Sequence, residues 1–95
     1  MPKKQIHIPS PCLTWQFDLS VRGTGIAAEC LSAYPLAYLD ALKSADALAK
    51  VICAQPFGCS SRLIRVNRVD GTECVELDSG QHEVHLTAHI TYGCG

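Results

Sequence analysis

Cys74 and His85 are the two residues whose types suit a nucleophile and its base. Both lie in segments that we expect to pair as antiparallel strands, with Asn67 beside them. Cross-strand neighbours lie about 5 Å apart, so a thiol, an imidazole and an amide would reach one another. The alternative is that all three are solvent-side residues of a sheet, which lacks the water exclusion and oxyanion donors of acyl-transfer sites.

Two histidines suggest a metal site at first sight. His85 and His89 have the H-x-x-x-H spacing that places two rings over one ion on a helix. On a strand the same spacing separates them by about 13 Å, because each residue rises about 3.3 Å. A site shared between two chains would draw on His82, His85, His89 or Cys94, without the usual ligand spacing. We predict no metal site and no cofactor.

The segment from Arg22 to Ala28 reads R-G-T-G-I-A-A and matches the G-x-G-x-x-A spacing of dinucleotide-binding turns. A dinucleotide fold needs a parallel strand that is buried on both faces, whereas the strand predicted here is amphipathic. The amides at the start of the following helix would still suit a phosphate or a carboxylate. We predict either a structural turn or an anion site at Arg22, Gly23 and Gly25.

The elements around these residues follow from periodicity. Residues 13–22 alternate between apolar and polar side chains, which predicts a half-buried strand. Residues 23–25 break that strand, and apolar residues then recur every three or four positions from Ile26 to Ile52, which predicts a helix. Pro35 lies inside it, so we expect either a kink or a pair of helices.

Residues 61–92 predict three consecutive antiparallel strands. Asp70-Gly71 and Ser79-Gly80 each predict a two-residue hairpin turn. These turns place Val75 opposite Val66 on one side and opposite Val84 on the other. They also place one apolar face on the last strand, formed by Val84, Leu86, Ala88, Ile90 and Tyr92.

The predicted fold is a single α+β domain over residues 1–95, in the order β-α(-α)-β-β-β. A three-stranded C-terminal meander and the N-terminal strand form an antiparallel sheet, and the kinked helix or helix pair packs on one face. This order resembles small cystatin-like and hot-dog-like layouts, a resemblance of arrangement that transfers no function.

The charge and the cysteines bear on partners and location. A net charge of −1 offers no cluster of basic residues for nucleic acid or an anionic membrane. No apolar run approaches the ~20 residues of a membrane span. The six cysteines lack C-x-x-C spacing, and several fall in periodic segments, so we predict free structural thiols and a cytoplasmic protein.

The low share of charged residues suggests that part of the surface is covered. Charged residues make up 18% of the chain and hydrophobic residues 47%, against a usual charged share of about 25%. We therefore predict a homo-oligomer, with a dimer as the first expectation. Its function would be binding, either of a protein or of a small apolar or anionic ligand between helix and sheet. Trp15, Tyr34 and Tyr38 would line that ligand site together with Phe17.

The alternative to binding is catalysis. The start of the chain, M-P-K-K-Q-I-H-I, resembles the start of tautomerase-superfamily proteins, which use an N-terminal proline amine as a base. The resemblance implies that Pro2 is a catalytic residue. It covers residues 1–8, and the chain then departs from the family pattern by inserting residues 9–22 before its helix. A small enzyme would use either Pro2 or the Cys74 and His85 pair.

Overall fold

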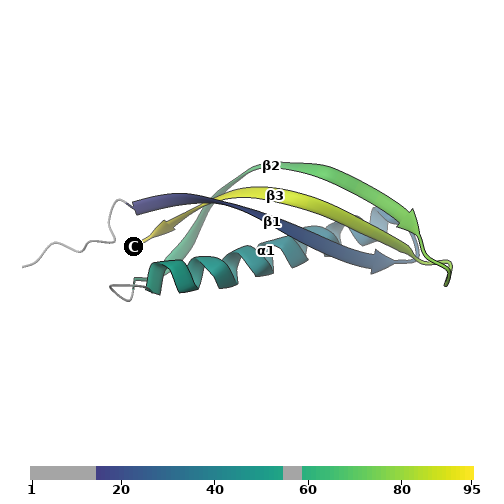
Figure 1. Ribbon diagram of the computed structural model, residues 1–95, viewed down its shortest axis with the longest axis horizontal. Coiled ribbons are helices and arrows are strands. Elements are labelled where there is room, and N and C mark those ends of the chain that lie inside the picture. Colours follow the sequence, from purple (N-terminus) through teal and green to yellow (C-terminus); the bar gives the residue numbers. More distant parts are fainter. Residues whose placement is uncertain (1–14, 55–58) are drawn as a thin grey trace, which may run out of the picture.

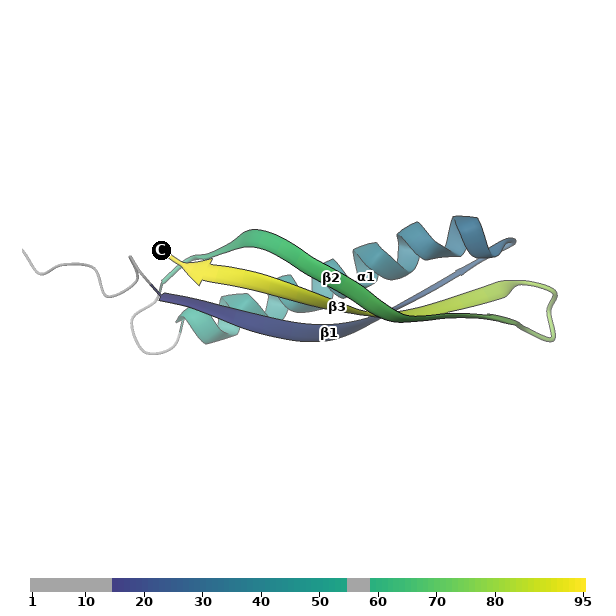
Figure 2. The ribbon, with the colours of Figure 1, turned by 90° about the horizontal axis from the view of Figure 1, so that it is seen from above.

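The computed structural model describes residues 15–54 and 59–95, which form three strands and one long helix. The strands form an antiparallel sheet in the order β1-β3-β2, so the last strand lies in the middle. The sheet covers one side of the helix (Figure 1), and the view from above shows β3 between its neighbours (Figure 2). The predicted α+β class is confirmed. The elements are β1 (Trp15–Ala27), α1 (Cys30–Ala54), β2 (Ser61–Glu76) and β3 (His82–Cys94).

The predicted turn at Asp70-Gly71 is wrong. β2 passes through both residues without reversing, so the part of the chain after the helix contains two long strands in place of three. Gly71 has a φ of 62°, and the three-residue step from Asp70 to Glu73 pairs with a two-residue step on β3. This is a β-bulge. A glycine at positive φ serves a bulge as well as a turn, so the Asp-Gly pair did not distinguish them.

The chain does reverse at Ser79-Gly80, but through a loop of three residues. The Gly80 N–H donates to the Leu77 carbonyl at 2.9 Å, the Leu77 N–H donates to the Gln81 carbonyl at 2.7 Å, and Gly80 has a φ of 87°. A turn followed by a left-handed glycine is a common three-residue hairpin loop. The extra loop residue shifts the predicted register by one.

This shift changes which face each residue of β2 occupies. Cys74 lies opposite Val84, and Val75 lies opposite Glu83. Because a one-residue slip moves every side chain to the other face, Cys74 shares the helix-facing side with Val84. Val75, which we predicted to be buried, is 45% exposed.

β1 also continues beyond its predicted end. Gly23 and Gly25 lie inside the strand, which ends at Ala27, so the predicted break is wrong. Both glycines are buried directly against α1: a Cβ on Gly25 would lie 2.8 Å from the Leu36 Cβ and closer still to the backbone of Ala33. The missing side chains let the strand backbone touch the helix, which is why a strand tolerates glycine here.

The helix presents alanines, and not its larger apolar residues, to the sheet. Its buried residues recur every four positions and are fully enclosed. Residues four apart form a ridge inclined to the helix axis, and strands of a twisted sheet can follow such a ridge. The larger residues predicted for the buried face include Leu31, which is 86% exposed. The buried row is Ala33, Ala37, Ala41, Ala45, Ala49 and Cys53.

α1 is one helix and not a pair, with Pro35 in its second turn. A proline there removes the bond that its N–H would give to the Leu31 carbonyl, and its ring crowds that carbonyl. A 25-residue helix packed along one side of a sheet tolerates that loss.

The apolar face of β3 is confirmed. Val84, Leu86, Ala88, Ile90 and Tyr92 are each at most 2% exposed and pack against the alanine row. β3 is therefore the core strand of the sheet, as its central position requires.

Disulfides join both ends of the helix to the sheet, so the prediction of free thiols is wrong. Cys30 is bonded to Cys74 at the start of α1, and Cys53 is bonded to Cys94 at its end. Cys59 is disulfide-bonded as well. The partners are 44 and 41 residues apart in sequence and meet only because helix and strands run alongside one another. The predicted strand register, which placed Cys74 on the outer face, concealed its proximity to Cys30.

Candidate functional site

The side of the sheet that faces away from α1, here called the outer face, carries polar side chains on all three strands. On β3 these are the residues that alternate with the buried apolar set, including His85, His89 and Thr91. Each has a partner on β1 and a partner on β2, so the side chains form rows that cross the sheet.

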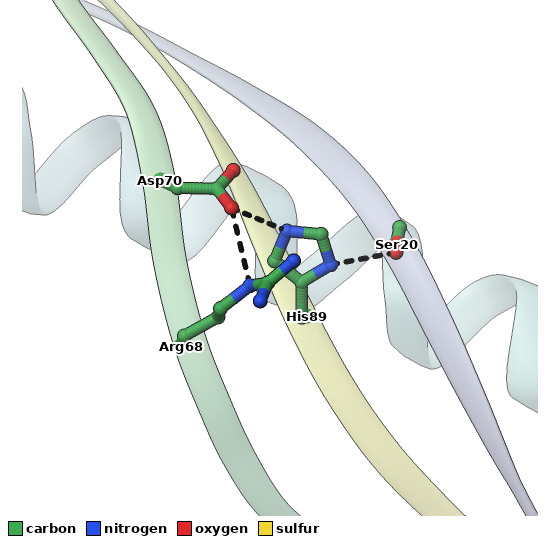
Figure 3. A network of polar contacts seen from close by, with 4 residues as sticks. All are labelled: Ser20, Arg68, Asp70 and His89. Carbon is green, nitrogen blue, oxygen red and sulfur yellow. Dashed lines mark hydrogen bonds and ion pairs between the residues drawn. The ribbon is translucent and has the colours of Figure 1, made fainter.

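One row is a chain of four polar residues from the three strands (Figure 3). Ser20 Oγ lies 2.8 Å from His89 Nδ1, and His89 Nε2 lies 2.9 Å from Asp70 Oδ2. Arg68 Nε lies 3.1 Å from the same carboxylate oxygen. The arrangement fits one tautomer of His89, in which Nε2–H donates to Asp70 and Nδ1 accepts the Ser20 hydroxyl.

A second row lies nearer the hairpin and joins β1 to β3 only, because its carboxylate comes from β3 itself. Thr24 Oγ1 lies 3.1 Å from His85 Nδ1, and His85 Nε2 lies 3.1 Å from Glu83 Oε1. The outer face thus holds two hydroxyl–imidazole–carboxylate chains, each centred on a histidine of β3.

A third row contains no histidine and is the most enclosed. The Thr91 hydroxyl donates to Asp18 at 2.6 Å and accepts from the Asn67 amide at 2.8 Å. Asn67 in turn accepts from Arg65 Nε at 2.7 Å. Thr91 is only 3% exposed, so its hydroxyl is held in place by neighbours on both sides.

A hydroxyl, an imidazole and a carboxylate in line are the side chains that acyl-transfer enzymes use. Such chemistry also needs donors aimed at a developing oxyanion, and strand N–H groups point along the sheet toward neighbouring strands. The row of Ser20 lies on an open surface, where Asp70 is 50% exposed. What the rows do supply is a set of donors and acceptors held at fixed places, which suits binding.

The predicted pair of Cys74 and His85 does not form. Cys74 lies on the helix-facing side and is bonded to Cys30, so it has no thiolate to offer. His85 lies on the outer face with Thr24 and Glu83 as its partners. The other candidate, Pro2, lies outside the described residues.

The predicted anion site is divided between the two faces of β1. Gly23 and Gly25 face α1, whereas Arg22 is exposed on the outer face opposite Thr87. The Thr24 N–H donates to Asp40 Oδ2 at 2.9 Å. A carboxylate of the helix therefore already accepts the hydrogen bond of this amide, which an external anion would need.

The aromatic residues predicted to line a ligand site do not gather around one space. Trp15 lies beside Phe17 with ring centroids 5.4 Å apart and the rings tilted by 43°, and Phe17 packs by Cys53 at the end of α1. Tyr34 is near the start of α1, 40% exposed, and Tyr38 packs against the alanine core. The two tyrosines therefore lie on the helix, away from Trp15.

A row of arginines on β2 is a feature that was not predicted from the sequence. Arg62, Arg65 and Arg68 lie opposite Gly93, Thr91 and His89, which share the outer face. On a regular strand, residues three positions apart lie on opposite faces. Here the register shifts after Leu63 and after Val66 return each following arginine to the outer face. The signal in the sequence was the repeated spacing R-x-x-R-x-x-R. A regular strand cannot place all three of these arginines on one face, so only an irregular strand turns this spacing into a row.

The chain matches no protein-family model, no curated protein and no solved structure. Among the described residues, no group of three His, Cys, Asp or Glu side chains is gathered closely enough to hold a metal ion. Within the same residues, no helix combines the length and the apolar character that crossing a lipid bilayer requires.

Proposed function

We propose that this protein acts by binding and that it works as a dimer formed through the outward side of α1. The observation that carries the proposal is a row of exposed residues two positions away from the buried alanines. Every member is exposed, and all but one are apolar. The row is Leu31, Pro35, Leu39, Lys43, Ala47 and Val51.

The first half of this row has the features of a helix-packing surface. Leu31 is 86% exposed and Leu39 is 52% exposed, with Tyr34 and Leu36 beside them at 40% and 46%. Contiguous exposed apolar surface of this kind is unusual on a monomer. Lys43 interrupts the row, so the apolar stretch belongs to the N-terminal half of the helix.

A second copy of the chain is the partner that this surface fits. Residues four apart form the ridges that interlock when two helices cross at about −50°, the commonest packing of helices in globular proteins. The same ridge on two copies can meet around a two-fold axis, which makes the interface self-complementary. A crossing centred on Pro35 brings Leu31 and Leu39 of each copy against the other and keeps the two Lys43 side chains apart.

The test is the mass in solution by light scattering and by sedimentation equilibrium. We expect the parent to be a dimer at micromolar concentration and Leu39→Lys to be a monomer with an unchanged circular dichroism spectrum. Val51→Lys is the matched control, because Val51 is similarly exposed, at 57%, but lies beyond Lys43. A dimer that survives Leu39→Lys, or dissociates with Thr87→Glu on the outer face, would exclude this interface.

A second candidate function is ester hydrolysis at Ser20, which the geometry of its hydrogen bond to His89 favours. Ser20 Oγ would attack an acyl carbonyl while His89 takes its proton, the alcohol would leave with that proton, and water would release the acid. Ser20→Ala should then abolish p-nitrophenyl acetate hydrolysis, while Ser44→Ala on the helix retains it. Equal rates for both variants would leave binding as the function.

The disulfides bear on where the protein works. Disulfides persist in oxidising compartments and are rare in the cytosol. We therefore favour an oxidising compartment over the cytoplasmic location that the sequence suggested. Alkylation of protein isolated from its source, followed by mass spectrometry, should find Cys30 and Cys74 unmodified before reduction. If these cysteines are alkylated, they are free thiols, and a reducing compartment is indicated.

A further inference from the structure

The arginine row, formed by Arg62, Arg65 and Arg68, is a line of positive charge along an exposed strand. The three residues pair with every second residue of β3, so successive arginines are about 7 Å apart along the sheet. All three are exposed. Their even spacing on one face depends on two irregularities of β2, and bulges of this kind commonly redirect side chains at functional surfaces.

Two of the three guanidinium groups are available to a ligand. Arg68 is paired with Asp70, but among the described residues neither Arg62 nor Arg65 forms an ion pair. Arg65 gives its Nε to the Asn67 side chain, which fixes the orientation of its guanidinium. Arg62 lies over Gly93, where a Cβ would come within 3.3 Å of its Nε. Asp18, which lies across the sheet from Arg65 on the other side of Thr91, is already bonded to the Thr91 hydroxyl.

We propose that the arginine row binds a linear sulfated polysaccharide. Guanidinium groups bind sulfate and phosphate oxygens through two parallel hydrogen bonds, and a regular row of them suits a chain with regularly spaced anions. Hydroxyl and amide groups of Ser20, Asn67 and Gln16 lie on the same face and can bond to sugar hydroxyls. The site lies on the layer opposite α1, so it does not depend on the proposed dimer.

The surroundings of the row favour a polysaccharide over a single-stranded nucleic acid. Proteins that bind single strands stack the bases on aromatic rings. On the described strands Trp15, Phe17 and Tyr92 all belong to the helix-facing side, since they pair with Cys94 and with one another. The arginine row therefore supplies positive charge beside Asp18 and Asp70, which are already bonded to Thr91 and His89, and the outer face of the described strands has no Trp, Tyr or Phe ring on which bases could stack. Disulfides also belong to the compartments where sulfated polysaccharides occur.

The test measures the affinity of the full chain for a heparin oligosaccharide at several salt concentrations. We expect Arg65→Gln to weaken binding about tenfold and to lower the slope of affinity against salt by about one. Lys50→Gln on the helix is the matched control, because it removes the same charge and should leave the affinity within about twofold. Arg65→Lys keeps the charge but loses the planar fork, so its affinity should fall between those of the parent and Arg65→Gln.

Each other outcome overturns the proposal. Equal weakening by Arg65→Gln and Lys50→Gln would mean attraction by overall charge. Tighter binding of an oligothymidine than of heparin at equal salt would assign the row to nucleic acid. An unchanged affinity, together with aggregation of Arg65→Gln, would mean that the arginines only keep the edge strand β2 from pairing with other chains. Circular dichroism of every variant separates these results from misfolding.

Discussion

The backbone of Gly23 packs against Ala41 so closely that a Cβ on Gly23 would lie 2.8 Å from the Cβ of Ala41. The Ala37 carbonyl oxygen is nearer still. β1 and α1 therefore touch along their backbones, and the thickness of the molecule at this point is set by two small residues.

Gly23→Ala should lower the free energy of unfolding by about 3 kcal/mol or more, because the methyl group meets backbone that cannot move aside. Urea unfolding measures it. Gly93→Ala is the control: its methyl would meet Ile64 Cδ1 at 3.0 Å, a side-chain end that can turn, so the loss should stay under about 1 kcal/mol. Ala41→Gly should not rescue Gly23→Ala, since the Ala37 carbonyl remains. A full rescue would show that Ala41 alone sets the separation.

Thr91→Val should cost about 1–3 kcal/mol of stability, although it conserves shape. It leaves the Asp18 carboxylate and the Asn67 amide without the hydroxyl between them, in a place that is 3% exposed. Ser20→Ala removes a comparable hydrogen bond on the exposed surface and should cost about 0.5 kcal/mol or less. Thermal unfolding of both variants gives the order, and a larger loss for Ser20→Ala would contradict this account of the outer face.

The two disulfides with both partners described should differ in their reaction with a dithiol reductant. Cys30 and Cys74 are exposed, whereas Cys53 and Cys94 are 0% and 1% exposed. Exchange requires a thiolate to reach the sulfur, so Cys30–Cys74 should be reduced about tenfold faster or more under native conditions. Timed alkylation followed by peptide mass spectrometry measures both rates. Simultaneous reduction with loss of the helical signal would mean that the exposed disulfide opens only on unfolding.

Alkaline pH should destabilise the protein through Tyr92. Burial raises the pKa of the Tyr92 phenol above 10.0, and the Asp46 carboxylate raises it further. The unfolded chain then loses this proton more readily than the folded chain, so the free energy of unfolding falls as pH rises above 10. Tyr92→Phe should show a smaller fall between pH 9 and pH 11 in urea titrations. Identical slopes for parent and variant would assign the alkaline loss to other groups.

Much of the fold could be predicted from apolar periodicity. The alternation of β3 from Val84 to Tyr92 predicted its buried face correctly. On a strand between two others, every second side chain points toward the helix, so the apolar residues must alternate to be buried there. The same reasoning failed for the helix. The apolar spacing placed Leu31 and Leu48 on the predicted stripe of the helix, but both are exposed, because the close approach of Gly23 admits only alanine. What decided that face was the distance between layers, which periodicity does not contain.

The candidate site was predicted less well, for a reason that one residue illustrates. A left-handed glycine is needed at a tight turn and at a bulge alike, and Gly71 was assigned to the turn. That choice reversed the direction of half of β2 and placed Asn67 beside Cys74, while the two-residue loop predicted at Ser79-Gly80 placed Cys74 opposite His85. Because the loop has three residues, Cys74 lies opposite Val84, and His85 meets Thr24 and Glu83 instead. Long-range register therefore governed the prediction of a site at Cys74 and His85.

The central position of β3 sets the order in which the chain can fold. β1 and β2 make no ladder with each other, and the strand that joins them is the last of the four elements to leave the ribosome. Until it emerges, the earlier strands have no partner in the sheet, and Cys53 must wait for Cys94. The sheet therefore cannot assemble until β3 has been synthesised, and during that delay an early wrong pairing or a chaperone can change the yield of folded protein.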